Sequence, residues 1–258
     1  MDINKSLCVV IPVYNEEKTV EAVLDKVLSR PETAEVIVVD DASTDASREV
    51  ILKYKDSHAD NKITIITQNE NMGKGAAIRR GFDVATAPIV IVQDADWEYS
   101  PDDYPLVLEP IITGKADVVY GSRFQEGPGQ VLNYRHMMGN KLITFVSNVF
   151  TNLALTDVES CYKVFKVEVI QNLNLETCRF GIEVEMTAKL AKARELRIYE
   201  VPISYNNRSY DEGKKITWKD GIAAFWHIFK YNVLDSKHTF YKSPWEDVLD
   251  TKTAPLEK

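Results

Sequence analysis

The sequence predicts an α/β fold in which a mainly parallel sheet is flanked by helices on both faces. Between residues 7 and 120, short apolar segments recur without the polar alternation of a half-exposed strand. This pattern is typical of parallel strands that are buried on both faces. Segments with apolar residues at helical spacing separate these strands, so strands and helices alternate along the chain. A length of 258 residues suits a single domain.

The boundaries of each element follow from these runs and from the residues that cap or end them. Strands are expected at residues 7–11, 36–39, 63–66, 89–92, 118–120 and 198–201. Helices are expected at residues 16–28, 75–85, 101–112, 135–153, 182–193 and 218–234. A further helix is capped by Ser43 or Thr44 and ends at Tyr54. Glycine, proline and polar residues predict loops at residues 123–134 and 205–216.

Composition and charge exclude several classes of function. The net charge of −8 argues against general nucleic-acid binding, which favours a basic surface. The three cysteines are irregularly spaced and the four histidines form no paired motif, so a zinc site is not expected. We expect no secretion signal and no bilayer-spanning helix. The sequence therefore predicts a protein of the reducing cytoplasm, with peripheral contact at the cytoplasmic membrane face as an alternative.

Polar clusters follow four of the expected strands. Ligands of parallel sheets bind beyond the carboxyl ends of the strands, so these clusters predict a cleft at that edge. The clusters are Tyr14–Glu17, Asp40–Asp41, Asp94–Glu98 and Gly121–Arg123.

Asp94 and Asp96 are the most informative pair in these clusters. They are two residues apart, so strand geometry directs both side chains to the same face. Two close carboxylates repel each other unless a cation or a proton lies between them. Carboxylate oxygens suit Mg²⁺ or Mn²⁺, which would neutralise a substrate diphosphate. The alternative is that both residues are solvated acids at the end of a strand.

Several segments together resemble glycosyltransferase family 2, whose members have the nucleotide-sugar-dependent GT-A fold. The segments that carry the resemblance cover residues 7 to 124 and are VVIPVYNEEKTV, VIVVDDASTDAS, NMGKGAAIRRGF, VQDADWEYSP and VVYGSRF. Two later segments resemble the dolichol- or polyprenyl-phosphate hexose synthase branch of the family, and these are LTDVESCYKVFK and VPISYNNRSYDEGKKITWKDG.

The resemblance implies a GT-A fold with a Rossmann-like sheet in a single domain with a C-terminal helical appendage. The domain would span residues 1–234, with a nucleotide-sugar half at about 1–124 and an acceptor half at about 125–234. Residues 235–258 would form a polar C-terminal tail.

The resemblance also assigns residues to the donor site. Asp94 would contact the sugar or the ribose, and Asp96 would bind the metal and the diphosphate. Glu98 would add a metal ligand, although relatives often have glutamine there. Asp41 would bind the base or the ribose, with a helix cap as the alternative. The full set implied for the nucleotide sugar is Pro12, Tyr14, Glu16, Val39, Asp41, Asp94, Ala95, Asp96, Arg208 and Lys214.

On the acceptor side, the resemblance points to basic groups and two acids. Guanidinium groups suit phosphate, so Arg123 and Arg135 are the candidates for an acceptor phosphate. Asp157 or Glu159 would be the general base for a hydroxyl acceptor, whereas for a phosphate acceptor they would only position basic groups. The residues expected to act in catalysis are therefore Asp94, Asp96, Arg123, Asp157 and Glu159.

Three features of the sequence each allow two interpretations. Residues 73–75 form either a phosphate loop or a tight turn into a helix. The basic residues of the 205–216 loop, Arg208, Lys214 and Lys215, either close over the diphosphate or are solvated. An apolar stripe lies either in the core or in a bilayer interface, and it consists of Trp218, Ile222, Phe225, Trp226, Phe229 and Val233.

The resemblance implies an inverting, metal-dependent hexosyltransferase of cell-envelope glycan or glycoprotein biosynthesis. Its cofactor would be Mg²⁺ or Mn²⁺, and its donor would be a nucleotide diphosphate sugar of the GDP-mannose or UDP-glucose type. Polyprenyl phosphate is the leading acceptor, and a membrane-protein partner is an alternative to peripheral membrane contact. The rival hypotheses are a saccharide or protein hydroxyl acceptor, and a non-catalytic scaffold that binds sugar nucleotides.

Overall fold

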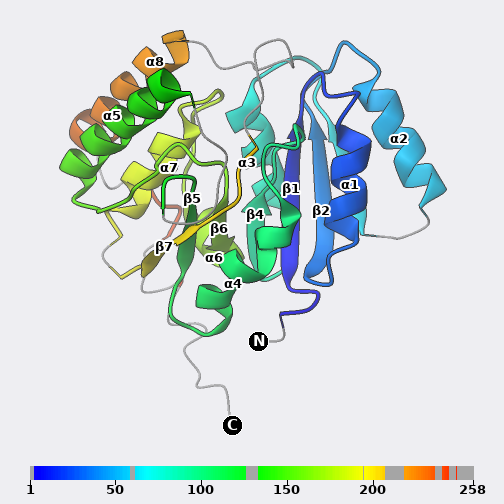
Figure 1. Ribbon diagram of the computed structural model, residues 1–258, viewed down its shortest axis with the longest axis horizontal. Helices are drawn as coiled ribbons and strands as arrows, with labels where there is room; N and C mark the ends of the chain where they lie inside the picture. Colours follow the sequence, from blue (N-terminus) through cyan, green and yellow to red (C-terminus); the bar gives the residue numbers. More distant parts are fainter. Residues whose placement is uncertain are drawn as a thin grey trace.

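Within the described residues, seven strands form one sheet that runs through the whole molecule (Figure 1). The computed structural model describes residues 3–58, 62–125, 133–193, 195–206, 218–235, 240–243 and 248, and only the backbone at 218–220. The strands are β1 (Leu7–Val13), β2 (Thr33–Asp40), β3 (Ile63–Thr67), β4 (Ile89–Val92), β5 (Val118–Ser122), β6 (Lys163–Lys166) and β7 (Ile198–Pro202).

The sheet is parallel except for one strand, which confirms the predicted α/β class. The strand order is β3-β2-β1-β4-β6-β5-β7. β6 is antiparallel to both of its neighbours, β4 and β5. All the other pairs of neighbouring strands are parallel.

Helices connect the strands and cover the sheet. They are α1 (Val20–Leu28), α2 (Ser47–Ser57), α3 (Lys74–Val84), α4 (Tyr104–Ile112), α5 (Tyr134–Thr151), α6 (Val167–Asn172), α7 (Ile182–Leu190) and α8 (Trp218–Phe229). A 3₁₀ turn (η1, Pro101–Asp103) precedes α4, and a π-helical turn (η3, Lys230–Leu234) follows α8. None of these described helices combines the length and the apolar character that a bilayer crossing needs.

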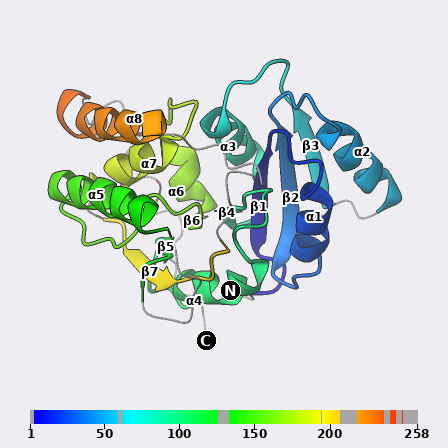
Figure 2. The ribbon, with the colours of Figure 1, turned by 45° about the horizontal axis from the view of Figure 1, so that its top comes forward.

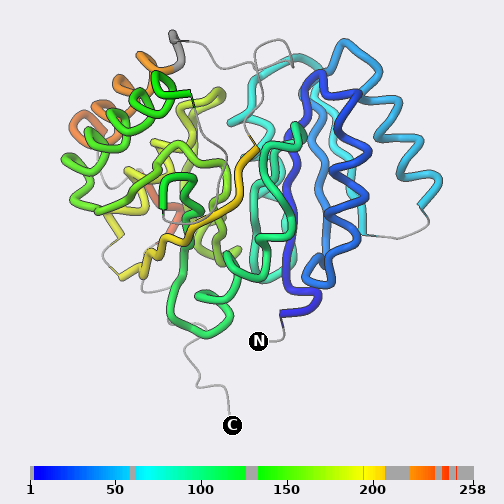
Figure 3. Tube along the Cα trace, viewed as in Figure 1, coloured from blue at the N-terminus to red at the C-terminus, as the bar shows by residue number. Residues whose placement is uncertain are grey.

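The two parts of the chain occupy opposite sides of the molecule. α1 and α2 pack together beside β1–β3, whereas α5, α7 and α8 pack together near β5–β7 (Figures 1 and 2). The Cα trace shows the same division between the blue and cyan part and the green to orange part (Figure 3). The two sides of the molecule are thus built from successive parts of the chain.

The apolar segments of the first part form the core as predicted. Residues 7–11 of β1 are fully buried, and so are residues 36–39 of β2. The stripe of α1 that faces the sheet, Val20, Val23, Leu24 and Val27, is also fully buried. Burial of this apolar surface is the main free-energy source for folding this layer.

Some predicted boundaries were wrong, and two elements were missed. α2 begins at Ser47, because residues 43–45 bind the loop around Asn15 instead of starting the helix: the backbone N–H of Thr44 donates to Asn15 Oδ1 at 2.8 Å. β6 and α6 were not predicted. Residues 240–243 of the predicted tail pack against the domain, where Phe240 is fully buried.

Candidate functional site

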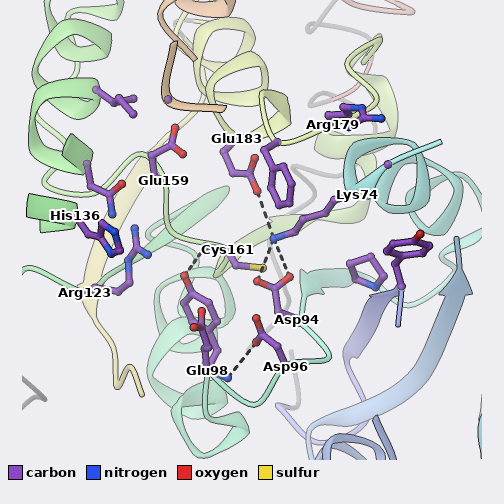
Figure 4. A pocket seen from close by; sticks show the side chains of 18 of the residues that line it. Lys74, Asp94, Asp96, Glu98, Arg123, His136, Glu159, Cys161, Arg179 and Glu183 are labelled. Atoms are coloured by element: carbon purple, nitrogen blue, oxygen red, sulfur yellow. Dashed lines mark hydrogen bonds and ion pairs between the residues drawn. The ribbon is translucent and has the colours of Figure 1, made fainter. Parts of the chain in front are cut away.

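One cavity of about 720 Å³ lies at the carboxyl ends of the parallel strands, where the sequence predicts a cleft. Its size is in the range of small-molecule sites in proteins. The ends of β1, β2 and β4 form one wall, and residues of α5, α7 and α8 form the other. Figure 4 shows charged side chains from both walls pointing into this space.

Most of the predicted donor-site residues line this cavity. They are Pro12, Tyr14, Glu16, Asp41, Asp94, Ala95 and Asp96. Val39 does not line it and lies fully buried within β2. Arg208, Lys214 and Lys215 fall outside the described residues. The roles assigned to these residues stay predictions.

The turns that follow the strands have an unusual backbone. Asn15, Ala42 and Trp97 have φ values of 53°, 56° and 66°. Left-handed φ is uncommon for residues other than glycine and costs free energy, about 1 kcal/mol or more each. Each of them lies just beyond a strand whose end lines the cavity, so strained turns surround the site.

Asp41 organises the loop that leads into α3. Its Oδ1 accepts hydrogen bonds from the side-chain amide of Gln68 at 2.6 Å and from the backbone N–H of Met72 at 2.8 Å. Its Oδ2 accepts the backbone N–H of Gly73 at 2.8 Å. The carboxylate of Asp41 is therefore held in place at the cavity wall before any ligand binds.

Lys74 connects the two walls of the cavity. Its Nζ lies 2.8 Å from Asp94 Oδ1 and 3.6 Å from Glu183 Oε1, at the start of α7 (Figure 4). Burial alone would lower the pKa of Lys74, but the charges of Asp94 and Glu183 raise it well above its ordinary value. The lysine is thus a fixed positive charge beside the first acid of the D-x-D pair.

Two glycines allow Lys74 to reach this position. Gly73 has a φ of 94°, a conformation that side chains rarely adopt. A Cβ atom on Gly73 would meet the carbonyl oxygen of Cys178 at 2.6 Å, and one on Gly75 would meet that of Thr177 at 2.5 Å. The segment is therefore a tight turn into a helix, as one interpretation held, and it also delivers a charge to the cavity.

Asp96 and Glu98 are the predicted metal ligands. Asp96 lines the cavity, and its Oδ1 accepts the backbone N–H of Glu98 at 3.1 Å. The side chain of Glu98 is buried and accepts a hydrogen bond from the Tyr205 hydroxyl at 2.8 Å. A carboxylate has two acceptor oxygens, so Glu98 can keep this hydrogen bond on Oε2 if it binds a metal ion through Oε1.

The donor set fits a divalent ion that is held largely by its substrate. Among the described residues there is no cluster of three or more metal-ligating side chains. Mg²⁺ commonly needs only one or two carboxylates and takes its other ligands from phosphates and water. Asp96 at the cavity wall satisfies that requirement, with Glu98 next to it in the same loop.

Arg123 and Asp157 form a buried ion pair at the end of β5. Arg123 Nε lies 2.7 Å from Asp157 Oδ2, and Nη2 donates to Oδ1 at 2.8 Å. Asp157 is fully buried and does not line the cavity, whereas Arg123 does. This geometry fits the predicted alternative in which Asp157 positions a basic group.

Glu159 and Glu183 present buried oxygens without partners. Within the described residues, Glu159 Oε1 and Glu183 Oε2 have no hydrogen-bond partner, and both residues line the cavity. Burial, followed by the charge of Glu183, raises the pKa of Glu159 to about 7. Such oxygens can accept hydrogen bonds from the hydroxyl groups of a sugar.

The wall formed by α5 and α8 is basic and apolar. Arg135 and His136 lie in the first turn of α5, and Ile143 lies further along the same helix. Ile222 and Phe225 of α8 complete this wall. An anionic group with an apolar substituent would match both properties.

Among the residues of the cavity wall with basic or acidic side chains, four were not assigned a role in the site. They are Lys74, His136, Arg179 and Glu183. The glycines around Lys74 were a visible signal, but no sequence pattern linked that turn to Glu183, which lies more than a hundred residues away.

Comparison with known proteins identifies one family. The model of the family described as Glycosyl transferase family 2 matches residues 8–173. The chain is 28% identical over 222 residues to the undecaprenyl-phosphate mannosyltransferase of Micrococcus luteus, with coverage of 80% of this chain and 85% of that protein. It is 27% identical over 250 residues to the dolichol-phosphate mannosyltransferase of Pyrococcus furiosus, with coverage of 94% and 65%.

A solved structure shares the fold. The glucosyl-3-phosphoglycerate synthase of Mycobacterium tuberculosis, crystallised with Mn²⁺, UDP and phosphoglyceric acid, matches with a TM-score of 0.68. The match covers 90% of this chain and 80% of that one at 18% identity. The predicted GT-A fold is confirmed by this likeness.

Proposed function

Because the chain belongs to glycosyl transferase family 2, we propose that this glycosyltransferase moves a hexose from a nucleotide diphosphate sugar to a polyprenyl phosphate. The names of the Micrococcus and Pyrococcus relatives support a polyprenyl or dolichyl phosphate as the acceptor. The Mycobacterium structure supports a divalent ion with a uridine diphosphate donor. The reaction would invert the configuration of the anomeric carbon.

One observation carries this proposal: a single cavity is lined by acids that follow β4 and by basic and apolar residues from the end of β5 and from α5 and α8. Asp94 and Asp96 are the acids, where a metal and a diphosphate would bind. Arg123, Arg135 and Ile222 are the basic and apolar residues, where a phosphate on an apolar chain would bind. The two substrates would thus meet inside one cavity.

The residues of the donor end would bind and orient the nucleotide sugar. Asp96, with Glu98 as a second candidate, would hold Mg²⁺ or Mn²⁺, which as a Lewis acid stabilises the negative charge of the departing diphosphate. Lys74 is held by Asp94 and adds a fixed positive charge near that diphosphate. Burial strengthens such electrostatic contacts relative to water.

At the acceptor end, Arg123 would hold the phosphate on the side of the sugar opposite to the leaving group. Its ion pair with Asp157 fixes the direction of the guanidinium. A phosphate ester is already anionic near neutral pH, so its oxygen can attack the anomeric carbon without a general base. The C–O bond to the acceptor forms as the bond to the diphosphate breaks, and the diphosphate leaves with the electron pair.

The properties of Glu159 support a second candidate function, which is transfer of the sugar to a hydroxyl group of a saccharide or protein. A hydroxyl acceptor needs a general base, and a base is most effective with a pKa near the working pH. The pKa of Glu159 is about 7, and its side chain lines the cavity. Under this hypothesis, Glu159→Gln abolishes transfer, whereas transfer to a phosphate survives it.

The proposal implies an enzyme that works in the cytoplasm beside a membrane, with donors of the GDP-mannose or UDP-glucose type. A thermal-shift screen of UDP-, GDP- and dTDP-sugars, with and without Mn²⁺, identifies the donor. Incubation of the radiolabelled donor with polyprenyl phosphate should then transfer the label into organic solvent. Label that enters only water-soluble products would contradict the lipid acceptor, and absence of any transfer would contradict the reaction.

A further inference from the structure

A segment near the C-terminus, residues 240–243, is bound to the loop that joins α6 to α7. Leu173 of that loop and Tyr241 form an isolated antiparallel bridge. The backbone N–H of Asn174 donates to the carbonyl oxygen of Phe240 at 2.8 Å. The Phe240 side chain is fully buried, so the segment is part of the packed domain. We refer to residues 240–243 as the clasp.

Asn172, at the end of α6, binds the clasp with its backbone and with its side chain. Its carbonyl oxygen accepts the backbone N–H of Lys242 at 2.9 Å. Its Oδ1 accepts the backbone N–H of Ser243 at 2.9 Å, and its Nδ2 donates to the carbonyl oxygen of Ser243 at 3.0 Å. Because Asn172 is buried, these hydrogen bonds satisfy polar groups that have little contact with water. They give the clasp a specific position.

A buried ion pair lies between the clasp and the loop. Lys189 Nζ is 2.6 Å from Glu185 Oε1, and both side chains are almost fully buried. The rings of Phe240 and Tyr231 cover the lysine, with Nζ 5.3 Å and 4.8 Å from their centroids. The Tyr241 hydroxyl donates to the carbonyl oxygen of Lys189 at 2.6 Å. The clasp therefore shields the ion pair from water on one side.

The ion pair holds the middle of the loop. Glu185 Oε1 accepts the backbone N–H of Glu176 at 2.9 Å, and Oε2 accepts that of Thr177 at 2.8 Å. Lys189 also donates to the carbonyl oxygen of Asn174. The loop forms no helix or strand here, so its backbone groups rely on the ion pair and on the clasp for hydrogen bonds.

The far end of the same loop contacts the start of α3. The backbone N–H of Ala76 donates to the carbonyl oxygen of Cys178 at 3.0 Å, and Arg79 Nη1 donates to that of Leu175 at 3.1 Å. The glycines on both sides of Lys74 let this turn approach the loop closely. A shift of the loop would therefore move Lys74 relative to the D-x-D pair.

We propose that the clasp positions Lys74 for the diphosphate by holding the loop between α6 and α7 against the start of α3. This inference rests on the proposed function for the diphosphate, but the link between the clasp and Lys74 does not. Lys74 lies 2.8 Å from Asp94 in the cavity (Figure 4). None of residues 240–243 lines the cavity, so the clasp acts as a positioning segment and touches no substrate.

Two substitutions at one position test the clasp in the full chain. Lys242→Pro removes the backbone N–H that Asn172 accepts, whereas Lys242→Ala keeps it. Both remove the lysine side chain, whose exposed ion pair of 3.8 Å with Asp83 contributes little to stability. Tyr241→Phe is a second variant, which removes the hydrogen bond to Lys189 and keeps the ring.

Hydrogen exchange followed by mass spectrometry measures the link without any substrate. Lys242→Pro should raise the exchange rates at residues 172–179 and 72–78 about tenfold, and Tyr241→Phe about threefold. Lys242→Ala should exchange as the wild type does. Equal exchange of the β1 amides in all four proteins shows that the fold is intact. Unchanged exchange at residues 72–78 in Lys242→Pro would overturn the proposal.

Nucleotide binding tests whether the clasp acts through Lys74. The probe is the nucleoside diphosphate that the donor screen identifies, titrated with Mn²⁺ in a calorimeter. Lys242→Pro should raise its Kd about threefold to tenfold, and Lys242→Ala should not. In a chain that also carries Lys74→Met, Lys242→Pro should have no further effect, because the positioned side chain is gone.

The remaining outcomes separate the clasp from the proposed reaction. Additive losses of affinity in the Lys74→Met, Lys242→Pro double variant would show a general structural role and overturn the proposal. If the wild type binds the nucleotide but transfers no sugar, the proposed function is contradicted and the coupling in the double variant still supports the clasp. If the wild type binds no nucleotide, the proposed function and the role toward the diphosphate are both contradicted.

Discussion

The side of the molecule that carries β1–β3 buries most of its apolar residues, whereas α5 and α8 on the other side expose many of theirs. The strand residues of β1 and the inner stripe of α1 are fully buried. On α5 and α8, one apolar face is buried and a second one is exposed. Folding therefore accounts for the apolar residues of the first side, because they are buried in the core. The second side has apolar residues that stay exposed after folding.

The two sides also bury different sets of charges. The first side buries single acids at the end of β2, Asp40 and Asp41. The second side buries ion pairs and lone charges in its interior, such as Arg123 with Asp157, and Lys189 with Glu185 at 2.6 Å. Lys163 is fully buried and donates to the backbone carbonyls of Val158 and Ser160. Buried charges are costly to desolvate and are retained where they fix a geometry. The side that carries β1–β3 is therefore stabilised mainly by apolar burial, whereas the side that carries α5 and α8 combines buried charges with exposed apolar surface.

The largest expected effect lies on the donor side of the cavity. Asp96→Ala should lower sugar transfer about a thousandfold or more, since a Lewis-acid contribution of several kcal/mol is lost. Turnover of the radiolabelled donor measures the loss, and binding of the nucleotide should also lose its dependence on Mn²⁺. Asp83→Ala is the matched control, because the Asp83 side chain is 56% exposed outside the cavity. Full turnover by Asp96→Ala would rule out the metal role.

The next effect concerns the contribution of the Arg123–Asp157 ion pair to stability. Asp157→Ala leaves Arg123 buried without its partner, which should lower the unfolding free energy by about 3–5 kcal/mol. Urea denaturation with a comparison of slopes measures it. Glu109→Ala removes an exposed partner of Lys115, whose ion pair is 3.2 Å long, and should change stability by less than about 0.5 kcal/mol. Equal losses in the two variants would contradict the expectation that the buried pair matters more to stability than the exposed one.

Glu159 makes the stability of the protein depend on pH. Its folded-state pKa of about 7 lies above the ordinary value of 4.5, so the folded chain binds this proton more tightly than the unfolded chain. The contribution to stability is fully present below pH 4.5 and is lost as the pH rises to about 7. Glu159→Gln should therefore gain roughly 1–3 kcal/mol relative to the wild type at pH 8 compared with pH 4. A difference that does not vary with pH would show that the carboxyl is not destabilised by burial.

The smallest effects compare two helix glycines. A Cβ on Gly81 of α3 would meet Val10 Cγ1 of β1 at 2.3 Å, so Gly81→Ala should cost about 1–3 kcal/mol through overpacking. A Cβ on Gly139 of α5 would meet nothing within 4 Å, so Gly139→Ala should gain about 0.5–1 kcal/mol from helix propensity. Thermal unfolding of both variants measures the difference. Losses of similar size would mean that the two sides are packed equally tightly.

The sequence was most informative where local pattern and burial agree. The strands of the first half are continuous apolar runs, and their ends carry the polar residues that line the cavity. β6 was missed because it has only four residues and begins and ends with lysine, of which Lys163 is buried by tertiary contacts. No local pattern predicts an antiparallel strand inserted between two parallel ones.

Contacts between residues that are distant in the sequence also could not be predicted. Lys74 lies near Glu183 because two glycines let α3 approach the backbone of residues 177–179. The stripe on α8 was left with two interpretations, because periodicity shows that apolar residues share a face but not whether that face is covered. The structure exposes Ile222, Trp226, Phe229 and Val233. The side chain of Trp218 lies outside the described ones.

The reversed direction of β6 decides which loops can serve the cavity. In a parallel sheet, the segment that follows each strand lies at the edge where ligands bind. The residues that these strands supply to the cavity therefore come from several separate segments of the chain. An antiparallel strand in the middle of the sheet sends the segment that comes before it to the same edge. Glu159 and Cys161 line the cavity for this reason, and they precede Lys163 at the start of β6. One reversal of chain direction thus brings an acid to the same cavity that the ends of the parallel strands line.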